Sequence, residues 1–159
     1  GNDAAQILAS NHPQGTAAFI KEMNLLAQDL KMDQTHFTNA AGLDDPDQMT
    51  TAYDLSILTR EVLKDPFLTR LIQTEKIQIT DLSGKIKHEL YNTNILLGKR
   101  ADVFGVKTGT TENAGQVLIS LVRRDDRQIL IVLMNSESRY QETEQLIDQI
   151  FANYDWHQL

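Results

Sequence analysis

Apolar residues recur at helical spacing in the first part of the chain and alternate with polar residues later. Residues 3–10 and 16–31 carry apolar side chains three and four positions apart, which predicts two amphipathic helices. Asn2 or Asp3 is expected to cap the first helix, and the residues around Pro13 separate the two. The side chains predicted to face inward are Ile7 and Leu8, then Phe19, Ile20, Met23, Leu26, Ala27 and Leu30.

Two further helices are predicted in the middle of the chain. Residues 35–43 read as extended or irregular, and the acidic run 44–47 around Pro46 reads as a solvated turn. Thr51 to Asp54 has the form of a capping box with Asp in place of Glu, so a helix is expected from there through Lys64. Pro66 opens another helical turn or two that ends near Thr74.

The remaining pattern is that of an antiparallel sheet closed by a helix. Residues 76–80 and 85–91 alternate around Ser83-Gly84 and predict a hairpin, and two strands are expected at 116–123 and 128–135. Residues 129–133 do not alternate, so both faces of that strand are expected to be covered. The last helix, 139–154, should turn inward a stripe made of Tyr140, Thr143, Ile147, Ile150 and Tyr154.

Helices followed by an antiparallel sheet and a packing helix indicate an α+β fold in one domain, residues 1–159. With 41% hydrophobic residues the chain can bury a core, and it contains no apolar run long enough to span a membrane. No signal peptide is visible at the start. Cysteine is absent, which excludes a disulfide, a thiolate nucleophile and a zinc–thiolate site.

Charge is unevenly distributed along the chain. The net charge of −7 disfavours a nucleic-acid partner. Residues 1–55 have a net charge of −6, residues 56–110 of +3, and residues 111–159 of −4. The positive segment suits an anionic ligand, although ordinary surface variation explains it equally well. The four histidines, at 12, 36, 88 and 157, lack metal-ligand spacing and are interpreted as surface or structural.

The most informative stretch is Lys107-Thr108-Gly109-Thr110-Thr111, which lies in the positive segment and precedes two apolar strands. A Lys-Thr-Gly on a strand is one of three elements of penicillin-interacting serine acyltransferases. A cation and a hydroxyl can meet a substrate carboxylate there, and glycine lets a substrate backbone approach. The alternative is an exposed lysine on an edge strand followed by a turn.

Other segments extend this match, and together they give a resemblance across essentially the whole chain. Residues 37–43 and 50–55 match a Gly-Leu turn and the capped helix after it, residues 92–97 match an Asn-x-Asn-x-Leu-Leu segment, and Gly1-Asn2-Asp3 matches the tail of a Ser-x-Asn motif. In these motifs the chain resembles the C-terminal part of the penicillin-binding domain of serine-type D-alanyl-D-alanine carboxypeptidases, the low-molecular-mass penicillin-binding proteins. The resemblance implies a β-lactamase- or transpeptidase-like fold, here incomplete.

The resemblance also implies an activity and roles for individual residues. A serine attacks a peptidoglycan stem peptide ending in D-Ala-D-Ala, and water hydrolyses the acyl-enzyme. Lys107 would hold the substrate carboxylate with the hydroxyl of Thr108 or Thr110, beside Gly109 and Arg139. The N–H of Thr110 would stabilise the oxyanion, and Asn2 would bind the substrate amide or steady the missing lysine. No metal or organic cofactor is implied. The implied location is extracytoplasmic, on the cell-wall side of the bacterial membrane.

One departure from the family pattern changes the expectation for this chain. Residues 1–159 contain no Ser-x-x-Lys, the motif that bears the nucleophile and its base, and the family's C-terminal β-rich domain is also missing. The chain alone is therefore expected to be inactive and not to react with β-lactams, and to self-associate through an exposed sheet edge. Two other readings stay open: a non-catalytic peptide-binding or interaction module, and a site completed by a separate chain.

Overall fold

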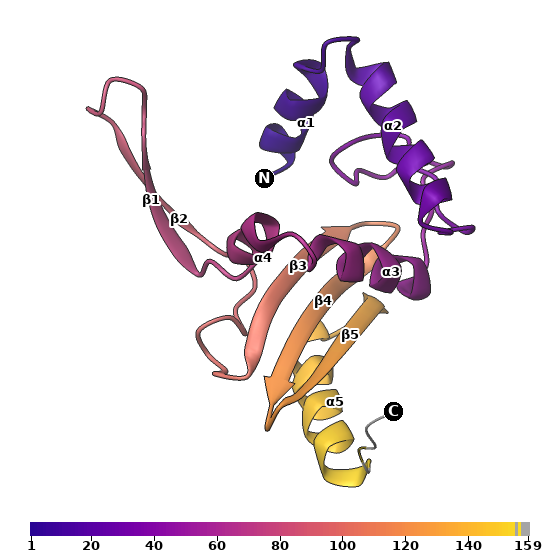
Figure 1. Ribbon diagram of the computed structural model, residues 1–159, viewed down its shortest axis with the longest axis vertical. Helices are drawn as coiled ribbons and strands as arrows, with labels where there is room; N and C mark the ends of the chain where they lie inside the picture. Colours follow the sequence, from indigo (N-terminus) through magenta and orange to yellow (C-terminus); the bar gives the residue numbers. More distant parts are fainter. Residues whose placement is uncertain (155, 157–159) are drawn as a thin grey trace.

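The computed structural model describes residues 1–154 and 156, and it has the predicted α+β order (Figure 1). Helices α3 and α4 cross one face of a three-stranded sheet, α5 covers the other face, and α1 and α2 form a separate layer beyond α3. The helices are α1 Asn2–Ser10, α2 Thr16–Asp29, α3 Ala52–Val62, α4 Pro66–Ile72 and α5 Arg139–Asn153. The strands are β1 Lys76–Thr80, β2 Lys87–Tyr91, β3 Val103–Thr111, β4 Gly115–Arg124 and β5 Arg127–Ser136.

The core lies between α5 and the antiparallel sheet β3-β4-β5. Its buried side chains come from both layers and from the segment before β3: Leu96, Val103, Leu118, Val122, Ile131 and Ile147. β5 contacts α5 and also α3, so the prediction that its apolar run is covered on both faces is confirmed. Burying such side chains contributes roughly 1.5–3 kcal/mol each, which makes this layer the main source of stability.

Helix α3 begins as the capping pattern predicts. Thr51 is the N-cap, and its hydroxyl accepts the N–H of Asp54 at 3.1 Å. The buried Asp54 carboxylate does not close the box. It accepts the N–H of Gln34 and the hydroxyl of Thr35 instead, which fastens the loop after α2 to α3. Helix α2 ends at Asp29, two residues before the predicted end, because Lys31 adopts the left-handed conformation with φ 61°.

Several side chains predicted to be inward are exposed. In α1, Ile7 and Leu8 are 59% and 68% exposed, and Leu26 of α2 is 50% exposed. Helix α1 packs mainly on α2, so nothing in the described part of the chain covers its outer face. The N-cap prediction was also wrong, since Gly1 is the N-cap and Asn2 is the first helical residue. In α5 the stripe is buried or half-buried except for Tyr154, which follows the helix and is exposed.

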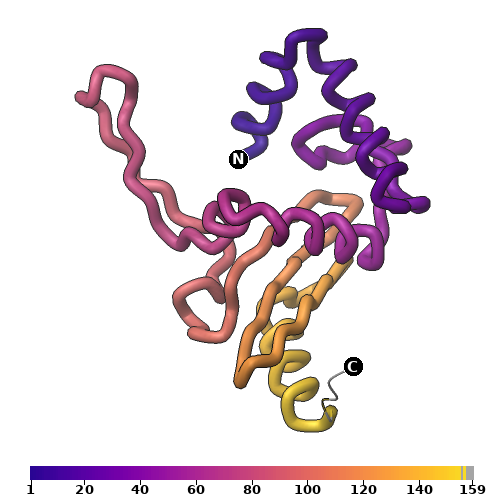
Figure 2. Tube along the Cα trace, in the orientation of Figure 1, coloured from indigo at the N-terminus to yellow at the C-terminus, as the bar shows by residue number. Residues whose placement is uncertain are grey.

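The predicted hairpin forms as a two-stranded ribbon, β1–β2, outside the main sheet. It projects from the body beside α4, as the backbone trace in Figure 2 shows. None of the described helices is long and apolar enough to cross a membrane. The histidine interpretation is supported at His12, which meets Glu22 at 3.3 Å, and at His36, whose ring contacts the carbonyl of Asp47. His157 lies outside the described residues.

Candidate active site

Strand β3 is an edge strand of the three-stranded sheet and carries the Lys-Thr-Gly sequence. Its pairing with β4 places Lys107 opposite Ile119 and Gly109 opposite Val117. Gly105 lets the end of α4 lie close to the strand, because its φ is +106° and an added Cβ would stand 2.8 Å from the carbonyl oxygen of Ile72. Helix α4 and the segment 92–97 therefore lie beside β3.

Lys107 presents a cation at this edge. The residue is exposed, and its ammonium folds back to donate to the carbonyl of Thr108. Loss of solvent around the ammonium, with a further contribution from the charge of Arg139, lowers the pKa of Lys107. An anion bound near both cations would offset their charge repulsion and favour the charged form of Lys107.

Arg139, the first residue of α5, contacts the same strand from the face of the sheet that α5 covers. Its Nη1 donates to the carbonyl of Gly109 and to the hydroxyl of Thr110, both at 2.7 Å. It also lies 3.5 Å from the carbonyl of Val117, directly opposite Gly109 in the register. The Nε of Arg139 is buried and has no hydrogen-bond partner in the part of the chain that the structure describes. This guanidinium therefore keeps unused donor capacity beside Thr110.

Among the described residues, no carboxylate neutralises these two cations. Within residues 1–154 and 156, none lies within 4.0 Å of Lys107 or Arg139. Glu142, one turn into α5, accepts instead from the hydroxyl of Ser136 and the N–H of Ser138. These bonds lower the pKa of Glu142 and hold its charge away from the strand. The edge of β3 is thus a place of uncompensated positive charge.

The two threonines of the motif differ in their surroundings. Thr108 is buried, and its hydroxyl lies 2.7 Å from the hydroxyl of Thr93. Thr110 is exposed and shares its hydroxyl with Arg139 and the carbonyl of Gly109. Thr110 can therefore reach a ligand at the edge directly, whereas Thr108 fixes the position of the 92–97 segment.

The segment 92–97 is held by its own asparagines, as their turn-forming chemistry would suggest. The amide of Asn92 bonds to the carbonyl of Thr74, and its oxygen accepts the N–H of Asn94. Asn94 is buried and bonds to the carbonyl of Gly105 and the N–H of Leu96. The hydrogen bonds of both asparagines therefore hold this segment against β3.

Sequence reasoning missed the role of Tyr140 in this arrangement. Its hydroxyl donates to the carbonyl of Thr93 at 2.7 Å and lies 3.3 Å from Nη2 of Arg139, whose guanidinium stands 4.8 Å from the Tyr140 ring centre. Tyr140 thereby ties the start of α5 to the 92–97 segment. In the sequence, this role was indicated only by the position of Tyr140, which follows Arg139 and begins the stripe of residues predicted to face inward.

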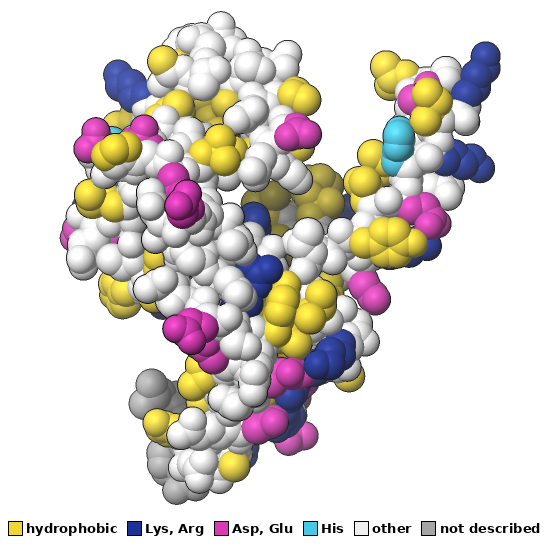
Figure 3. All heavy atoms as spheres, turned by 180° about the vertical axis from the view of Figure 1, so that it is seen from behind, with side chains coloured by type: hydrophobic (Ala, Val, Ile, Leu, Met, Phe, Trp, Pro, Cys, Tyr) yellow, Lys and Arg dark blue, Asp and Glu magenta, His cyan; other side chains and the backbone are white. Residues whose placement is uncertain are grey.

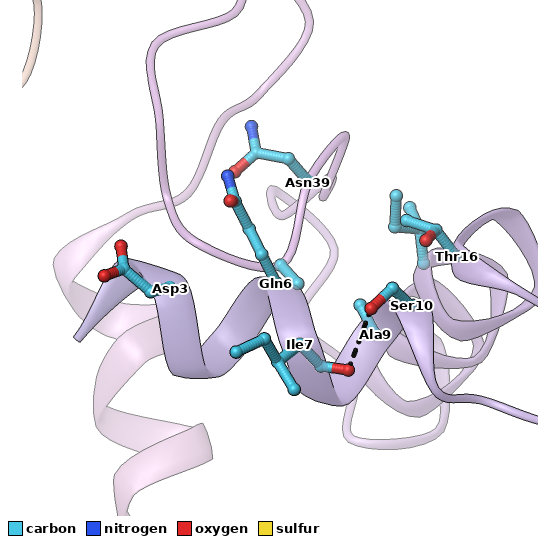
Figure 4. Close-up of a pocket in the computed structure, with 9 residues that line it drawn as sticks. Asp3, Gln6, Ile7, Ala9, Ser10, Thr16 and Asn39 are labelled. Carbon is cyan, nitrogen blue, oxygen red and sulfur yellow. Dashed lines mark hydrogen bonds between the residues drawn. The ribbon is translucent and has the colours of Figure 1, made fainter.

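Asn2 is not brought to this edge by hydrogen bonding. Within the described residues it forms no hydrogen bond with Lys107, Thr110 or Arg139. A cavity of about 560 Å³ lies near it, between α1, α2 and the loop at Asn39. The side chain of Gln6 points from α1 toward the loop that carries Asn39, and both residues line this cavity (Figure 4). Its single charged lining residue is Asp3, so it does not share the chemistry of the β3 edge.

A Lys-Thr-Gly sequence on an edge strand of an antiparallel sheet is one of the elements of the penicillin-interacting serine acyltransferase class, and here Arg139 of α5 contacts that strand. The solved structures agree. A D-alanyl-D-alanine carboxypeptidase from Mycobacterium tuberculosis H37Rv matches with a TM-score of 0.83 and 25% identity, covering 100% of this chain and 62% of that chain. Penicillin-binding protein D2 from Listeria monocytogenes in its cefotaxime-bound form matches with a TM-score of 0.80 and 30% identity, covering 95% and 61%.

The family model described as D-alanyl-D-alanine carboxypeptidase matches residues 1–138. The chain belongs to this family. D-alanyl-D-alanine carboxypeptidase DacF from Bacillus subtilis (strain 168) is 30% identical over 162 residues, which cover 100% of this chain. The chain spans 41% of the length of that relative. The predictions of family and fold class are confirmed.

Proposed function

We propose that the protein to which this chain belongs removes the terminal D-Ala from peptidoglycan stem peptides through a serine acyl-enzyme. A serine hydroxyl attacks the carbonyl between the two D-Ala residues, its proton passes through a base to the leaving amine, and water then hydrolyses the ester. The nucleophile would come from a Ser-x-x-Lys segment, which residues 1–159 do not contain. This chain supplies the part that binds the carboxylate and the oxyanion.

The observation that carries the proposal is the pair of uncompensated cations that meet at β3, Lys107 on the strand and Arg139 at the start of α5. Lys107 and Arg139 approach one strand edge from two elements, and no described carboxylate pairs with either. A peptide ending in D-Ala brings a carboxylate that would satisfy both, together with the exposed hydroxyl of Thr110. Hydrogen bonds to charged groups contribute roughly 1.5–3 kcal/mol each, enough to position a small substrate.

The backbone of Thr110 is suited to stabilise the oxyanion. The carbonyls of Gly109 and Val117 share one nitrogen of Arg139, so the Gly109 carbonyl is directed toward β4. In a trans peptide the following N–H points the opposite way, which turns the N–H of Thr110 toward the open edge. Such a fixed donor can stabilise developing negative charge on the attacked carbonyl oxygen. Gly109 keeps that approach free of a side chain.

Asn2 keeps its proposed role as a ligand of the substrate amide, at the start of α1. A location on the cell-wall side of the membrane follows from the substrate. β-Lactams would acylate the same serine, which agrees with the cefotaxime-bound form of the Listeria relative.

We also propose that the chain on its own self-associates through the unpaired edge of β5, because an open strand edge pairs readily with another chain.

The test is the acylation rate of a protein that carries this chain together with its Ser-x-x-Lys segment. Lys107→Ala is expected to lower kcat/KM for a D-Ala-D-Ala peptide by roughly ten- to a hundredfold, because one charged hydrogen bond is lost. Thermal stability should change little, since Lys107 is exposed. Equal acylation by Lys107→Ala and the parent would overturn the assignment.

Gly109 offers a second variant with a clean control. An added Cβ would meet only the Cβ of Val117 at 3.7 Å, an ordinary contact, so Gly109→Ala should fold normally. Gly109→Val places more bulk beside the path of the substrate backbone and should block acylation while leaving the charge unchanged. Acylation of Gly109→Val at the rate of Gly109→Ala would show that the substrate does not lie along this strand.

The alternative is a non-catalytic peptide-binding module, favoured by the missing Ser-x-x-Lys. Mass spectrometry after incubation with a penicillin separates the possibilities for this chain. We expect no covalent adduct on residues 1–159 alone, and one on the protein that includes the serine segment. Absence of an adduct on both would favour the module.

A further inference from the structure

The β1–β2 hairpin is the most exposed ordered part of the described chain. Every residue of both strands is exposed, and Leu82 in the turn is 110% exposed. Isolated two-stranded hairpins are marginally stable in water, so an apolar ribbon of this kind benefits from a partner surface. Figure 1 shows the hairpin extending away from the rest of the molecule.

The hairpin has one apolar face. The register pairs Ile77 with Leu90 and Ile79 with His88, and side chains alternate along each strand. The side chains of Ile77, Ile79 and Leu90 therefore share a face and are 43–48% exposed. Ile86, two residues before His88, continues this face toward the turn and is 56% exposed. The opposite face carries polar residues together with Tyr91.

The turn that carries Leu82 is fixed by one carboxylate. Asp81 accepts the N–H of Ile86 at 2.8 Å and the N–H of Ser83 at 3.2 Å, and also bonds to the Ser83 hydroxyl. These hydrogen bonds, that of the Ser83 side chain foremost, lower the pKa of Asp81. Leu82 is therefore held outward at the tip by a structured turn.

The charges of the hairpin leave two lysines free near this tip. Residues 76–91 hold three lysines and two acidic residues. Glu89 pairs with Lys76 at 2.9 Å, and Asp81 is engaged in the turn. In the described part of the chain, no carboxylate lies within 4.0 Å of Lys85 or Lys87. Figure 3 shows lysines and hydrophobic side chains together on the projecting hairpin.

We propose that this hairpin binds an anionic phospholipid surface, with Leu82 inserted between headgroups and with Lys85 and Lys87 on the lipid phosphates. A lipid surface needs no shape-matched pocket, and lysine stems can lie along the apolar layer while their charges stay at the phosphates. A second copy of the chain fits less well, because one face of about five side chains is far below the roughly 20–30 residues per side of a stable interface.

The acidic body of the protein does not oppose this contact. A five-residue strand is about 17 Å long, which exceeds the Debye length of about 8 Å at physiological salt. The net charge of −7 is therefore largely screened at the tip. The inference is independent of the proposed enzymatic function.

The test is binding of the full chain to vesicles of phosphatidylcholine alone and of phosphatidylcholine mixed with the anionic lipid phosphatidylglycerol, measured by co-sedimentation. Binding is expected only with the anionic lipid. Leu82→Asp should lower the partition coefficient at least about tenfold. The double variant Lys85→Gln/Lys87→Gln should lower it about twenty-five-fold at low salt, at about fivefold per lysine.

Matched controls remove equal groups elsewhere on the surface. Leu8→Asp changes another exposed leucine, and Lys21→Gln/Lys31→Gln removes two exposed lysines; both should bind like the parent. Equal binding to the two kinds of vesicle, or equal binding by Leu82→Asp and the parent, would overturn the proposal. A lipid-free dimer that Leu82→Asp dissociates would also overturn it and would assign the face to a second copy.

Discussion

The α5 side of the sheet and the α1–α2 pair bury their apolar side chains to very different extents. Leu118 and Ile147 are completely buried between β4 and α5, whereas Ile7 and Leu8 of α1 are 59% and 68% exposed. Apolar burial is the dominant favourable contribution to folding. The sheet and α5 therefore contribute most of the stability, whereas the α1–α2 layer keeps an exposed apolar face.

The candidate site belongs to the well-packed side. Lys107 stands on β3, and Arg139 begins α5, whose Ile147 is anchored in the core. A site built on rigid elements keeps its donors in place without a ligand. Asn2, by contrast, stands on α1, most of whose residues are exposed.

The largest expected effect comes from truncating one leucine in each region. Leu118→Ala should lower the free energy of unfolding by about 2–5 kcal/mol, because Leu118 is fully buried and its truncation leaves a cavity in the core. Leu8→Ala should change it by less than about 0.5 kcal/mol. Urea unfolding of both variants measures the difference. If both variants lost the same free energy of unfolding, Leu8 would be buried in solution, and the two regions would not differ in burial.

A cluster of ion pairs beside the sheet, formed by Arg100, Arg124 and Asp102, predicts that the stability of the fold depends on pH. Arg100 and Arg124 bond to Asp102, at 3.0 and 2.6 Å, and these hydrogen bonds, that of Arg100 foremost, lower the pKa of Asp102 to about 2. The folded pKa is below the unfolded value of roughly 3.9, so the stabilisation is present above pH ~4 and is lost as pH falls through about 2.

Asp102→Asn should therefore lower the free energy of unfolding by about 2 kcal/mol at neutral pH and by almost nothing near pH 2. Thermal unfolding of both proteins from pH 7 to pH 2 measures this convergence. A stability difference between the two proteins that stays constant over that range would show that the charge of the Asp102 carboxylate does not stabilise this cluster.

A smaller effect is expected at α3, which lies between the two regions. Thr51→Ala removes the cap on the N–H of Asp54 and should cost about 1 kcal/mol, whereas Thr51→Ser should restore most of it. The same urea titration applies. A serine variant as weak as the alanine variant would assign the loss to packing of the methyl group.

Local patterns predicted the elements because their signals are local. The Thr51 cap, the turn around Ser83-Gly84 and the apolar runs of β4 and β5 each depend on nearby residues, and all appear in the structure. The exposure of Ile7, Leu8 and Leu26 could not be predicted in that way. Periodicity shows that a face is apolar, but only the tertiary arrangement decides whether anything covers it.

The site was predicted in part, for a similar reason. Lys107 and Gly109 stand out through the motif, and Arg139 was expected beside them. The burial of Thr108 against Thr93 and the bond from Tyr140 to the Thr93 carbonyl depend on contacts between segments 15 and 47 residues apart. No spacing rule in a single sequence reports contacts at such separations.

The most direct test of the account is binding of an acetylated peptide ending in D-Ala-D-Ala to the ¹⁵N-labelled chain, followed by NMR. We predict shifts of the Gly109 and Thr110 amides, and at least about tenfold weaker binding for Lys107→Ala and Arg139→Ala, with Lys64→Ala unchanged. The same peptide with its C-terminal carboxylate amidated should not bind. Equal affinity for the amidated peptide, or unchanged affinity in Lys107→Ala, would contradict the claim that this strand edge binds the substrate carboxylate.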